Sequence, residues 1–152
     1  MKRTDRRIRL CTALLVCNLI FIWGNSLLPA EISQAFSDWV KEVLLGLVSG
    51  GNSSGSGGSG VLRKIAHFTE FSALGFLLSW RFGMLDKGKF PPFVCGAAAA
   101  CIDETIQMFV PDRGPGILDV LLDCSGVLTG MLLLHFGHTY FMRKTIHNNS
   151  EE

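Results

Sequence analysis

Long apolar runs alternate with short polar segments along this chain, and the first run is the clearest. Residues 10–28 are nineteen consecutive positions without a charged side chain, preceded by a basic segment and followed by Pro29. At ~1.5 Å of rise per residue, a helix of this length approaches the ~30 Å hydrocarbon thickness of a bilayer. The small-x-small cleavage site of a secretory signal peptide does not follow the run. We therefore predict an uncleaved membrane helix over 10–28.

Three further apolar runs follow, at 64–82, 91–110 and 117–136. The two connections between them, 83–90 and 111–116, are short, and short connections favour antiparallel neighbouring helices. The prediction is an all-α fold, a four-span transmembrane helix bundle that forms a single domain over the whole chain.

The region between the first two runs has two parts of different character. Apolar residues in 31–48 recur at i, i+3, i+4 and i+7, with polar residues on the opposite face, which predicts an amphipathic helix. Such a helix lies either in the membrane interface, with Trp39 at headgroup depth, or on the protein's own surface. Residues 49–60 are almost entirely Gly, Ser and Asn, so we predict a flexible linker there.

Composition and charge narrow the class of protein. The chain is 48% hydrophobic with a mean hydropathy of +0.34, which is high for a soluble domain of this size. A net charge of +1 gives no indication of a nucleic-acid partner. With a cytoplasmic N-terminus, ten Lys and Arg fall on the inner side (Lys2, Arg3, Arg6, Arg7, Arg9, Arg81, Lys87, Lys89, Arg143, Lys144) and four on the outer side (Lys41, Arg63, Lys64, Arg113). This excess predicts that both termini are cytoplasmic.

The five cysteines all lie within the apolar runs: Cys11, Cys17, Cys95, Cys101 and Cys124. Their spacing does not match a zinc site, and their odd number argues against a disulfide framework. We expect them to be small buried hydrophobic residues.

Polar residues interrupt the second, third and fourth runs, although charges inside membrane-length segments are costly and are usually functional. At 100° per residue they gather on one side of each helix: Arg63, His67 and Glu70 on the second, Asp103, Glu104 and Gln107 on the third, and Asp119 and Asp123 on the fourth. In the predicted topology these helix ends all face outward. We therefore expect one cavity in the outer leaflet, with Arg63, Lys64 and Arg113 at its mouth.

A simpler interpretation is that these polar residues only hydrogen-bond the helices together. Five acids, a histidine and an amide exceed what such a role requires, so we favour a functional site. Below them on the fourth helix, Gly126 and Gly130 would allow two helices to approach closely.

At these residues the chain resembles the VanZ-like family of small bacterial multi-pass membrane proteins. The matching segments are 63–71, 74–75, 103–113 and 119–123, with Gly126 and Gly130, and more weakly 25–29. One departure is Asp123, where the family more often has Asn. The resemblance implies a cell-envelope protein of the bacterial cytoplasmic membrane, mostly of Gram-positive bacteria. It also implies a connection with antibiotic resistance, because the family's namesake is associated with lowered sensitivity to teicoplanin.

The first functional hypothesis is a site that binds, or chemically processes, a membrane lipid or lipid-linked amphiphile of the envelope. In an enzyme, His67 and Glu70 would be a general acid/base pair. Asp103, Glu104 and Asp119 could hold a divalent cation such as Mg²⁺ or Mn²⁺. The candidate substrate-binding residues are Arg63, Lys64, Gln107, Arg113 and Asp123. The sequence leaves open whether the site is catalytic.

Two other functions are compatible with the same residues. Buried carboxylates with a histidine also suit a proton- or cation-coupled transporter. However, the inner halves of the spans, 74–80 and 127–134, offer no polar path. Alternatively, the chain is a non-catalytic accessory subunit whose polar residues pair with another envelope protein or with a second copy of the chain.

Overall fold

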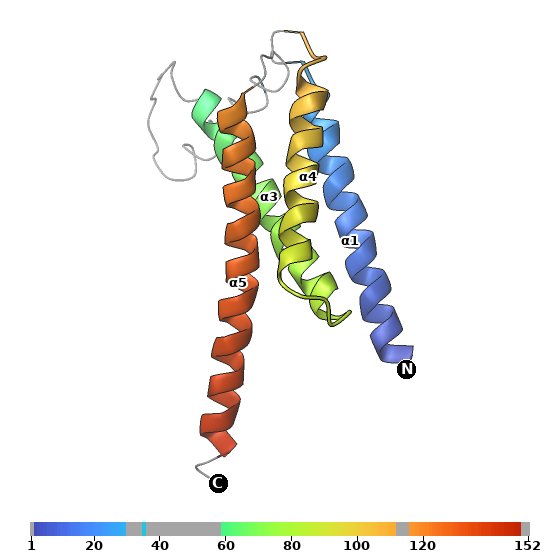
Figure 1. Cartoon of the computed structure of the whole chain (residues 1–152), viewed down its shortest axis with the longest axis vertical. Coiled ribbons are helices and arrows are strands. Elements are labelled where there is room, and N and C mark those ends of the chain that lie inside the picture. The colour runs from blue at the N-terminus through green and yellow to red at the C-terminus, as the bar shows by residue number, and fades with distance from the viewer. Residues whose placement is uncertain (1, 30–34, 36–58, 112–115, 150–152) are drawn as a thin grey trace, which may run out of the picture.

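The computed structural model describes residues 2–29, 35, 59–111 and 116–149. Four helices account for most of them: α1 (Lys2–Ser26), α3 (Ser59–Gly83), α4 (Phe90–Gln107) and α5 (Ile117–Asn149). The described part contains no strand, so the all-helical prediction is confirmed. Neighbours in sequence run antiparallel, which brings the start of α1 and the end of α5 to the same end of the bundle (Figure 1).

The helix boundaries differ from the predicted runs in three places. α3 begins at Ser59, inside the segment predicted as a linker, because the apolar residues Val61 and Leu62 extend its pattern backwards. α4 ends at Gln107 rather than at the predicted residue 110, and a turn then leads to Pro111. The helical conformation is disfavoured for the residue before a proline, so the helix stops ahead of it. α5 continues to Asn149, thirteen residues past the predicted end, because no proline follows to stop it.

The predicted amphipathic helix over 31–48 lies outside the described residues, except for residue 35. The same holds for the predicted linker up to residue 58.

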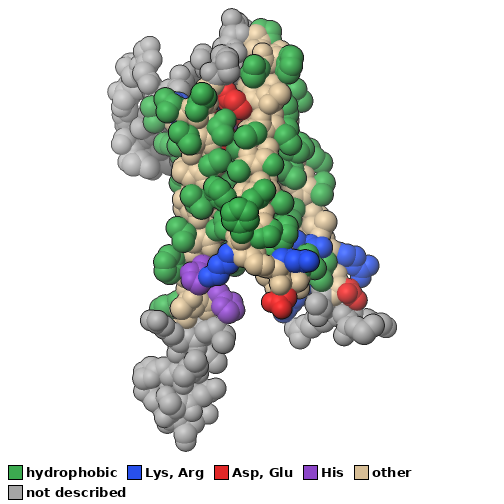
Figure 2. All heavy atoms as spheres, in the orientation of Figure 1, with side chains coloured by type: hydrophobic (Ala, Val, Ile, Leu, Met, Phe, Trp, Pro, Cys, Tyr) green, Lys and Arg blue, Asp and Glu red, His purple; other side chains and the backbone are tan. Residues whose placement is uncertain are grey.

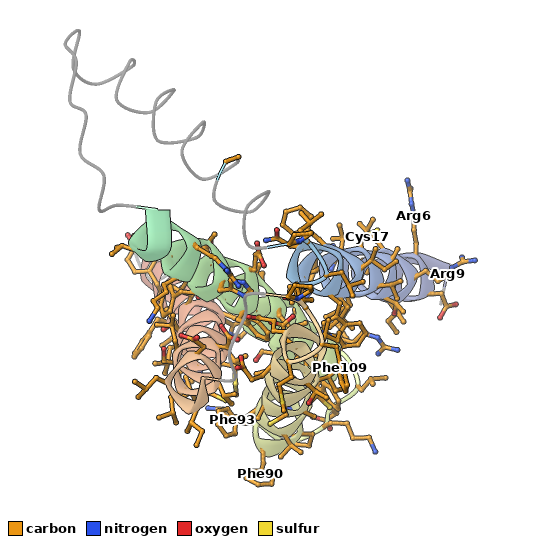
Figure 3. All side chains as sticks on the ribbon, turned by 90° about the horizontal axis from the view of Figure 1, so that it is seen from above. Arg6, Arg9, Cys17, Phe90, Phe93 and Phe109 are labelled. Carbon is orange, nitrogen blue, oxygen red and sulfur yellow. The ribbon has the colours of Figure 1, made fainter. Side chains whose placement is uncertain are left out.

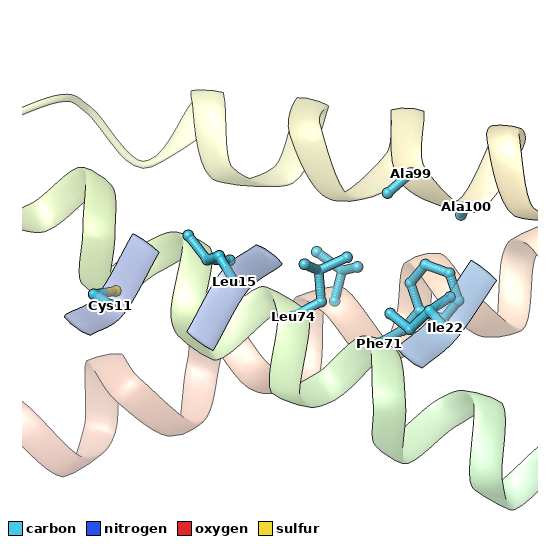
Figure 4. Close-up of a cluster of buried hydrophobic side chains, with 8 residues drawn as sticks. Cys11, Leu15, Ile22, Phe71, Leu74, Ala99 and Ala100 are labelled. Carbon is cyan, nitrogen blue, oxygen red and sulfur yellow. The ribbon is translucent and has the colours of Figure 1, made fainter. Parts of the chain in front are cut away.

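The core lies where α1, α3, α4 and α5 meet. In Figure 4, Leu15 and Ile22 of α1 and Phe71 and Leu74 of α3 face the small residues Ala99 and Ala100 of α4. Val127 of α5 completes the buried cluster. The core is thus built from single apolar faces of the helices, which leaves their other faces on the outside.

The prediction for the cysteines is wrong for most of them. Cys11 is buried, but Cys17, Cys95 and Cys101 are exposed and Cys124 is only partly buried. The helices are apolar on their outward faces too, so an apolar position does not imply burial. All five thiols are free.

Close backbone approach between α3 and α5 positions the two helices. A Cβ added at Gly126 would lie 2.7 Å from the Phe68 carbonyl oxygen, and one at Gly75 would lie 2.8 Å from the Cα of Val127. At Gly130, an added Cβ would lie 2.7 Å from the backbone nitrogen of Phe76. Small residues at helix contacts permit this approach. Because the backbones touch here, side chains about one turn away, such as those of His67 and Asp123, are also brought close.

The outer surface of the bundle is largely apolar (Figure 2). Exposed hydroxyl groups on it donate to carbonyl groups of their own helix, for example Thr105 to Cys101 at 2.7 Å and Ser125 to Leu122 at 2.6 Å. A hydroxyl satisfied in this way does not need water. Both features suit a hydrocarbon surrounding, where every polar group must find a partner within the protein.

Two of the described helices are long and apolar enough to cross a membrane. These segments are Asp5–Ser26, of 22 residues, and Ile117–Tyr140, of 24 residues. α3, which contains Lys64, Glu70 and Arg81, and α4, which contains two adjacent carboxylates, are not among them. Length and composition therefore support two of the four predicted membrane spans, α1 and α5.

The two ends of the bundle differ in chemistry. We call the end where α3 and α5 begin the polar end, and the opposite end the basic end. At the basic end Lys and His side chains gather on the surface (Figure 2), and the exposed Arg6 and Arg9 of α1 point away from the other helices (Figure 3). A cavity of about 710 Å³ lies there between α3, α5 and the start of α4. Its apolar lining includes Trp80, Met84 and Met131, and its polar lining includes Lys87, Lys89, His135 and His138.

Candidate functional site

Buried polar residues of three helices meet at the polar end. His67 of α3, Asp103 of α4 and Asp123 of α5 are 8%, 0% and 2% exposed. One nitrogen or oxygen atom of each lies within 4.8 Å of the corresponding atoms of the other two. We call these residues the His–Asp–Asp cluster. Each helix contributes from the face that also packs in the core, so the cluster follows directly from the way the helices approach one another.

Gln107 connects the cluster to the rest of the polar end. Its Nε2 donates to Asp103 Oδ2 at 2.7 Å and to Ser26 Oγ at 3.3 Å, while its Oε1 accepts from Arg63 Nη2 at 3.2 Å. His67 Nδ1 lies 3.8 Å from the same Oδ2 atom. One amide therefore holds the Asp103 carboxylate in place and links α1, α3 and α4.

Two further buried or partly buried carboxylates have single partners. Glu104 Oε1 accepts a hydrogen bond from the backbone N–H of Gly116, which ties the end of α4 to the start of α5. Glu70 Oε1 accepts from Asn25 Nδ2 at 3.1 Å, which ties α3 to the end of α1. Both contacts anchor helix ends around the cluster.

Three carboxylate oxygens at the polar end are buried without a hydrogen-bond partner among the described residues: Glu70 Oε2, Asp103 Oδ1 and Glu104 Oε2. Buried polar atoms are almost always satisfied, and an unsatisfied one at a carboxylate is costly. Negative charge is also concentrated here, since Asp123 interacts electrostatically with Asp103, Asp119, Glu104 and Glu70. Such an arrangement favours the binding of a positively charged or hydrogen-bond-donating ligand.

Positive charge within the described part of this end comes from Arg63 and Lys64. Arg63 is partly buried and interacts electrostatically with Asp119, Asp103 and Glu104. Lys64 Nζ lies 3.4 Å from Asp119 Oδ1 in an exposed ion pair. The positively charged side chains of Arg63 and Lys64 thus lie at the edge of the site, beside the carboxylates rather than between them.

The structure brings together part of the predicted set. His67, Asp103, Gln107 and Asp123 are in the interior of the polar end, with Arg63 hydrogen-bonded to Gln107. The remaining predicted residues have other positions: Glu70 contacts Asn25 of α1, Glu104 contacts the Gly116 backbone, Lys64 and Asp119 pair at the surface, and Arg113 lies outside the described residues.

The set of residues suited to a cation differs from the predicted one. The sequence suggested that Asp103, Glu104 and Asp119 could hold a divalent cation, but Glu104 accepts from Gly116 and Asp119 pairs with Lys64. Among the described residues the atoms that lie together belong to His67, Asp103 and Asp123. The close approach of α3 and α5 brings His67 and Asp123 near each other, and Asp103 of α4 joins them.

Asn25 and Ser26 are part of the polar end although the predicted site did not include them. Ser26 is fully buried and accepts from Gln107, and Asn25 donates to Glu70. The signal in the sequence was a polar pair at the very end of an apolar run, at the depth where the other helices carry their charges.

Residues 8–138 match the model of a protein family described as VanZ/LLP1. The chain belongs to the VanZ/LLP1 family. The match includes every residue of the polar end described above and confirms the resemblance seen in the sequence. VanZ/LLP1 membership and the two apolar helices together support a membrane protein. No curated protein and no solved structure matches this VanZ/LLP1 chain.

Proposed function

We propose that this protein is a multi-pass protein of the bacterial cytoplasmic membrane whose polar end binds the headgroup of an amphiphilic envelope component. The observation that carries the proposal is the His–Asp–Asp cluster, in which three helices each bury an ionisable group within 4.8 Å of the others. Helices held together by hydrogen bonds alone would not need three buried carboxylate oxygens that find no partner in the described part of the chain.

In this proposal all four helices cross the membrane and both termini are cytoplasmic. α4 has 18 residues, which at ~1.5 Å per residue is close to the thickness of the hydrocarbon layer. Its two carboxylates are buried against α3 and α5, so they would not face lipid. The excess of Lys and Arg at the basic end supports its cytoplasmic location, with the polar end outside.

An amphiphile suits the surroundings of the site. Large apolar side chains are exposed around the polar end, with Phe109 at 84% and Ile117 at 82% exposure, and they could contact acyl chains. Arg63 and Lys64 at the edge of the site could bind an anionic headgroup such as a phosphate. The cluster would then bind, or act on, the part of the headgroup that enters between the helices.

Transport has less support than binding. Phe71, Leu74 and Val127 fill the middle of the bundle below the cluster and are almost fully buried. A proton or cation moving from the cluster toward the basic end would have to pass this apolar layer.

The test uses cells that lack the chromosomal copy and express the full chain or its variants at equal abundance. We expect His67→Ala and Asp123→Asn to change sensitivity to teicoplanin and other envelope-directed compounds, because both remove groups from the cluster. Asp86→Asn is the matched control: it is the same chemical change at an exposed position of the basic end. Sensitivity equal to wild type in both cluster variants would overturn the proposal. Loss of a co-purifying envelope protein, with unchanged binding of anionic lipid vesicles, would favour an accessory subunit instead.

A further inference from the structure

We propose that His67, Asp103 and Asp123 bind a divalent transition-metal ion, Mn²⁺ or Zn²⁺. The proposal goes beyond headgroup binding and does not depend on it, since the ligands all come from the chain itself. It rests on the positions of three side chains and on an unsatisfied oxygen of one of them.

The spacing of the three ligand atoms is close to that of a metal site. With metal–ligand distances of ~2.1 Å, ligand atoms around one ion lie at most ~4.2 Å apart. The nitrogen and oxygen atoms of the cluster lie within 4.8 Å of one another. A small inward movement of the side chains, without any movement of the helices, would complete the coordination.

Asp103 provides the second observation. Its side chain is fully buried, and its Oδ1 atom has no hydrogen-bond partner among the described residues. Its Oδ2 atom is held by Gln107, which is in turn held by Arg63 and Ser26. One oxygen of this carboxylate is fixed by an amide, and the other has no hydrogen-bond partner among the described residues, so it is available to a cation. Hydrogen bonds from surrounding residues orient metal ligands in this way.

Charge favours the same conclusion. Asp123 lies in the field of four other carboxylates. Arg63 interacts electrostatically with Asp103, and its hydrogen bond goes to the amide of Gln107. Like charges this close are unfavourable when both are ionised. A divalent cation between Asp103 and Asp123 would convert this repulsion into attraction.

The ligand types select the ion. One imidazole with two carboxylates suits Zn²⁺ or Mn²⁺ better than Mg²⁺ or Ca²⁺, which prefer oxygen ligands alone. Three protein ligands leave at least one coordination position open, as in catalytic metal sites. Water or a phosphate oxygen of a headgroup could occupy it.

The experiment measures metal binding to the full chain in detergent. After treatment with chelator and removal of the chelator, MnCl₂ or ZnCl₂ is titrated by calorimetry, and the bound metal is counted by mass spectrometry. We expect about one ion per chain, and a loss of affinity of tenfold or more in His67→Gln and Asp123→Asn. Asp86→Asn, the same chemical change at an exposed position of the basic end, should bind within about twofold of wild type.

A variant could bind metal poorly either because it has lost a ligand or because it does not fold. Thermal unfolding of the same samples distinguishes these two causes. Metal should raise the Tm of wild type and of Asp86→Asn, and should leave that of Asp123→Asn unchanged. In chelator, Asp123→Asn should have a Tm at or above that of wild type, because one of two repelling carboxylates is removed. Wild type that binds no stoichiometric ion, or variants that bind as tightly as wild type, would overturn the site. Altered drug sensitivity in variants of a protein that binds no metal would leave the headgroup proposal standing by itself.

Discussion

The polar end and the basic end of the bundle both contain ionisable residues but use them differently. At the polar end His67, Asp103 and Asp123 face inward and are buried. At the basic end Lys87 and Lys89 are exposed. Burial separates the two cases, because a charge in contact with water costs little, whereas a buried charge needs a partner. An ionisable residue in an apolar run therefore indicates a site only when its helix turns it toward the other helices.

The contacts at each end agree with this difference. Lys89 Nζ lies 3.5 Å from His135 Nδ1 at the surface of the basic end, beside the apolar cavity. These groups can move into water without affecting the packing below them. At the polar end, Gln107 links three helices through Asp103, Arg63 and Ser26, so a change there affects several partners at once.

The largest effect is expected from a change in the approach of α3 and α5. Gly126→Val would place side-chain atoms against the Phe68 carbonyl and the Phe71 side chain, which belong to the facing helix and cannot easily move. Overpacking of this kind costs about 3 kcal/mol. We expect a lower free energy of unfolding in detergent titration and loss of function at the polar end.

Gly137→Val is the control for that change. It is the same substitution further along α5, where nothing lies within 4 Å of an added Cβ. Valine replaces glycine in a helix with little intrinsic cost. Equal destabilisation by the two variants would mean that the close approach of α3 and α5 does not hold the polar end together.

The second effect concerns Gln107. Gln107→Leu removes three hydrogen bonds and leaves Asp103 Oδ2 buried without its donor, at about 2–3 kcal/mol in total. Thr105→Val on the same helix removes a hydroxyl that bonds only to the Cys101 carbonyl, and it should change the free energy of unfolding by less than about 0.5 kcal/mol. The two variants are compared in one unfolding series. A cost for Gln107→Leu as small as that for Thr105→Val would show that the polar end is not a connected network.

Helical periodicity explains which part of this arrangement was predictable. Run lengths predicted the number and order of the described helices, and a rotation of 100° per residue placed His67, Asp103 and Asp123 on single faces. Periodicity could not predict which atoms pair, since that depends on how closely the axes approach. Gly126 and Gly75 decide this approach of α3 and α5, and through it the proximity of His67 and Asp123.

The errors have related causes. Cys17 and Cys95 were expected to be buried because they stand in apolar runs, but both lie on outward faces that are themselves apolar. Asn25 and Ser26 were not included in the site, although they stand at the end of the first apolar run in the weakly matching segment 25–29. In both cases the sequence pattern does not distinguish an inward from an outward surface, and only the packing of the helices does.

The smallest effect is expected from removing the ion pair of Lys64 and Asp119. This change tests whether the burial of a residue, or merely its position at the polar end, determines its contribution to stability. This pair belongs to the polar end, but its side chains are 60% and 42% exposed. Exposed ion pairs contribute little, so Lys64→Ala and Asp119→Asn should each lower the free energy of unfolding by less than about 0.5 kcal/mol. The double variant should show a coupling of similar size, and the coupling should fall as salt is raised, because an exposed pair is screened. A coupling that exceeds the cost of Gln107→Leu would mean that proximity to the polar end, and not burial, makes a residue important there.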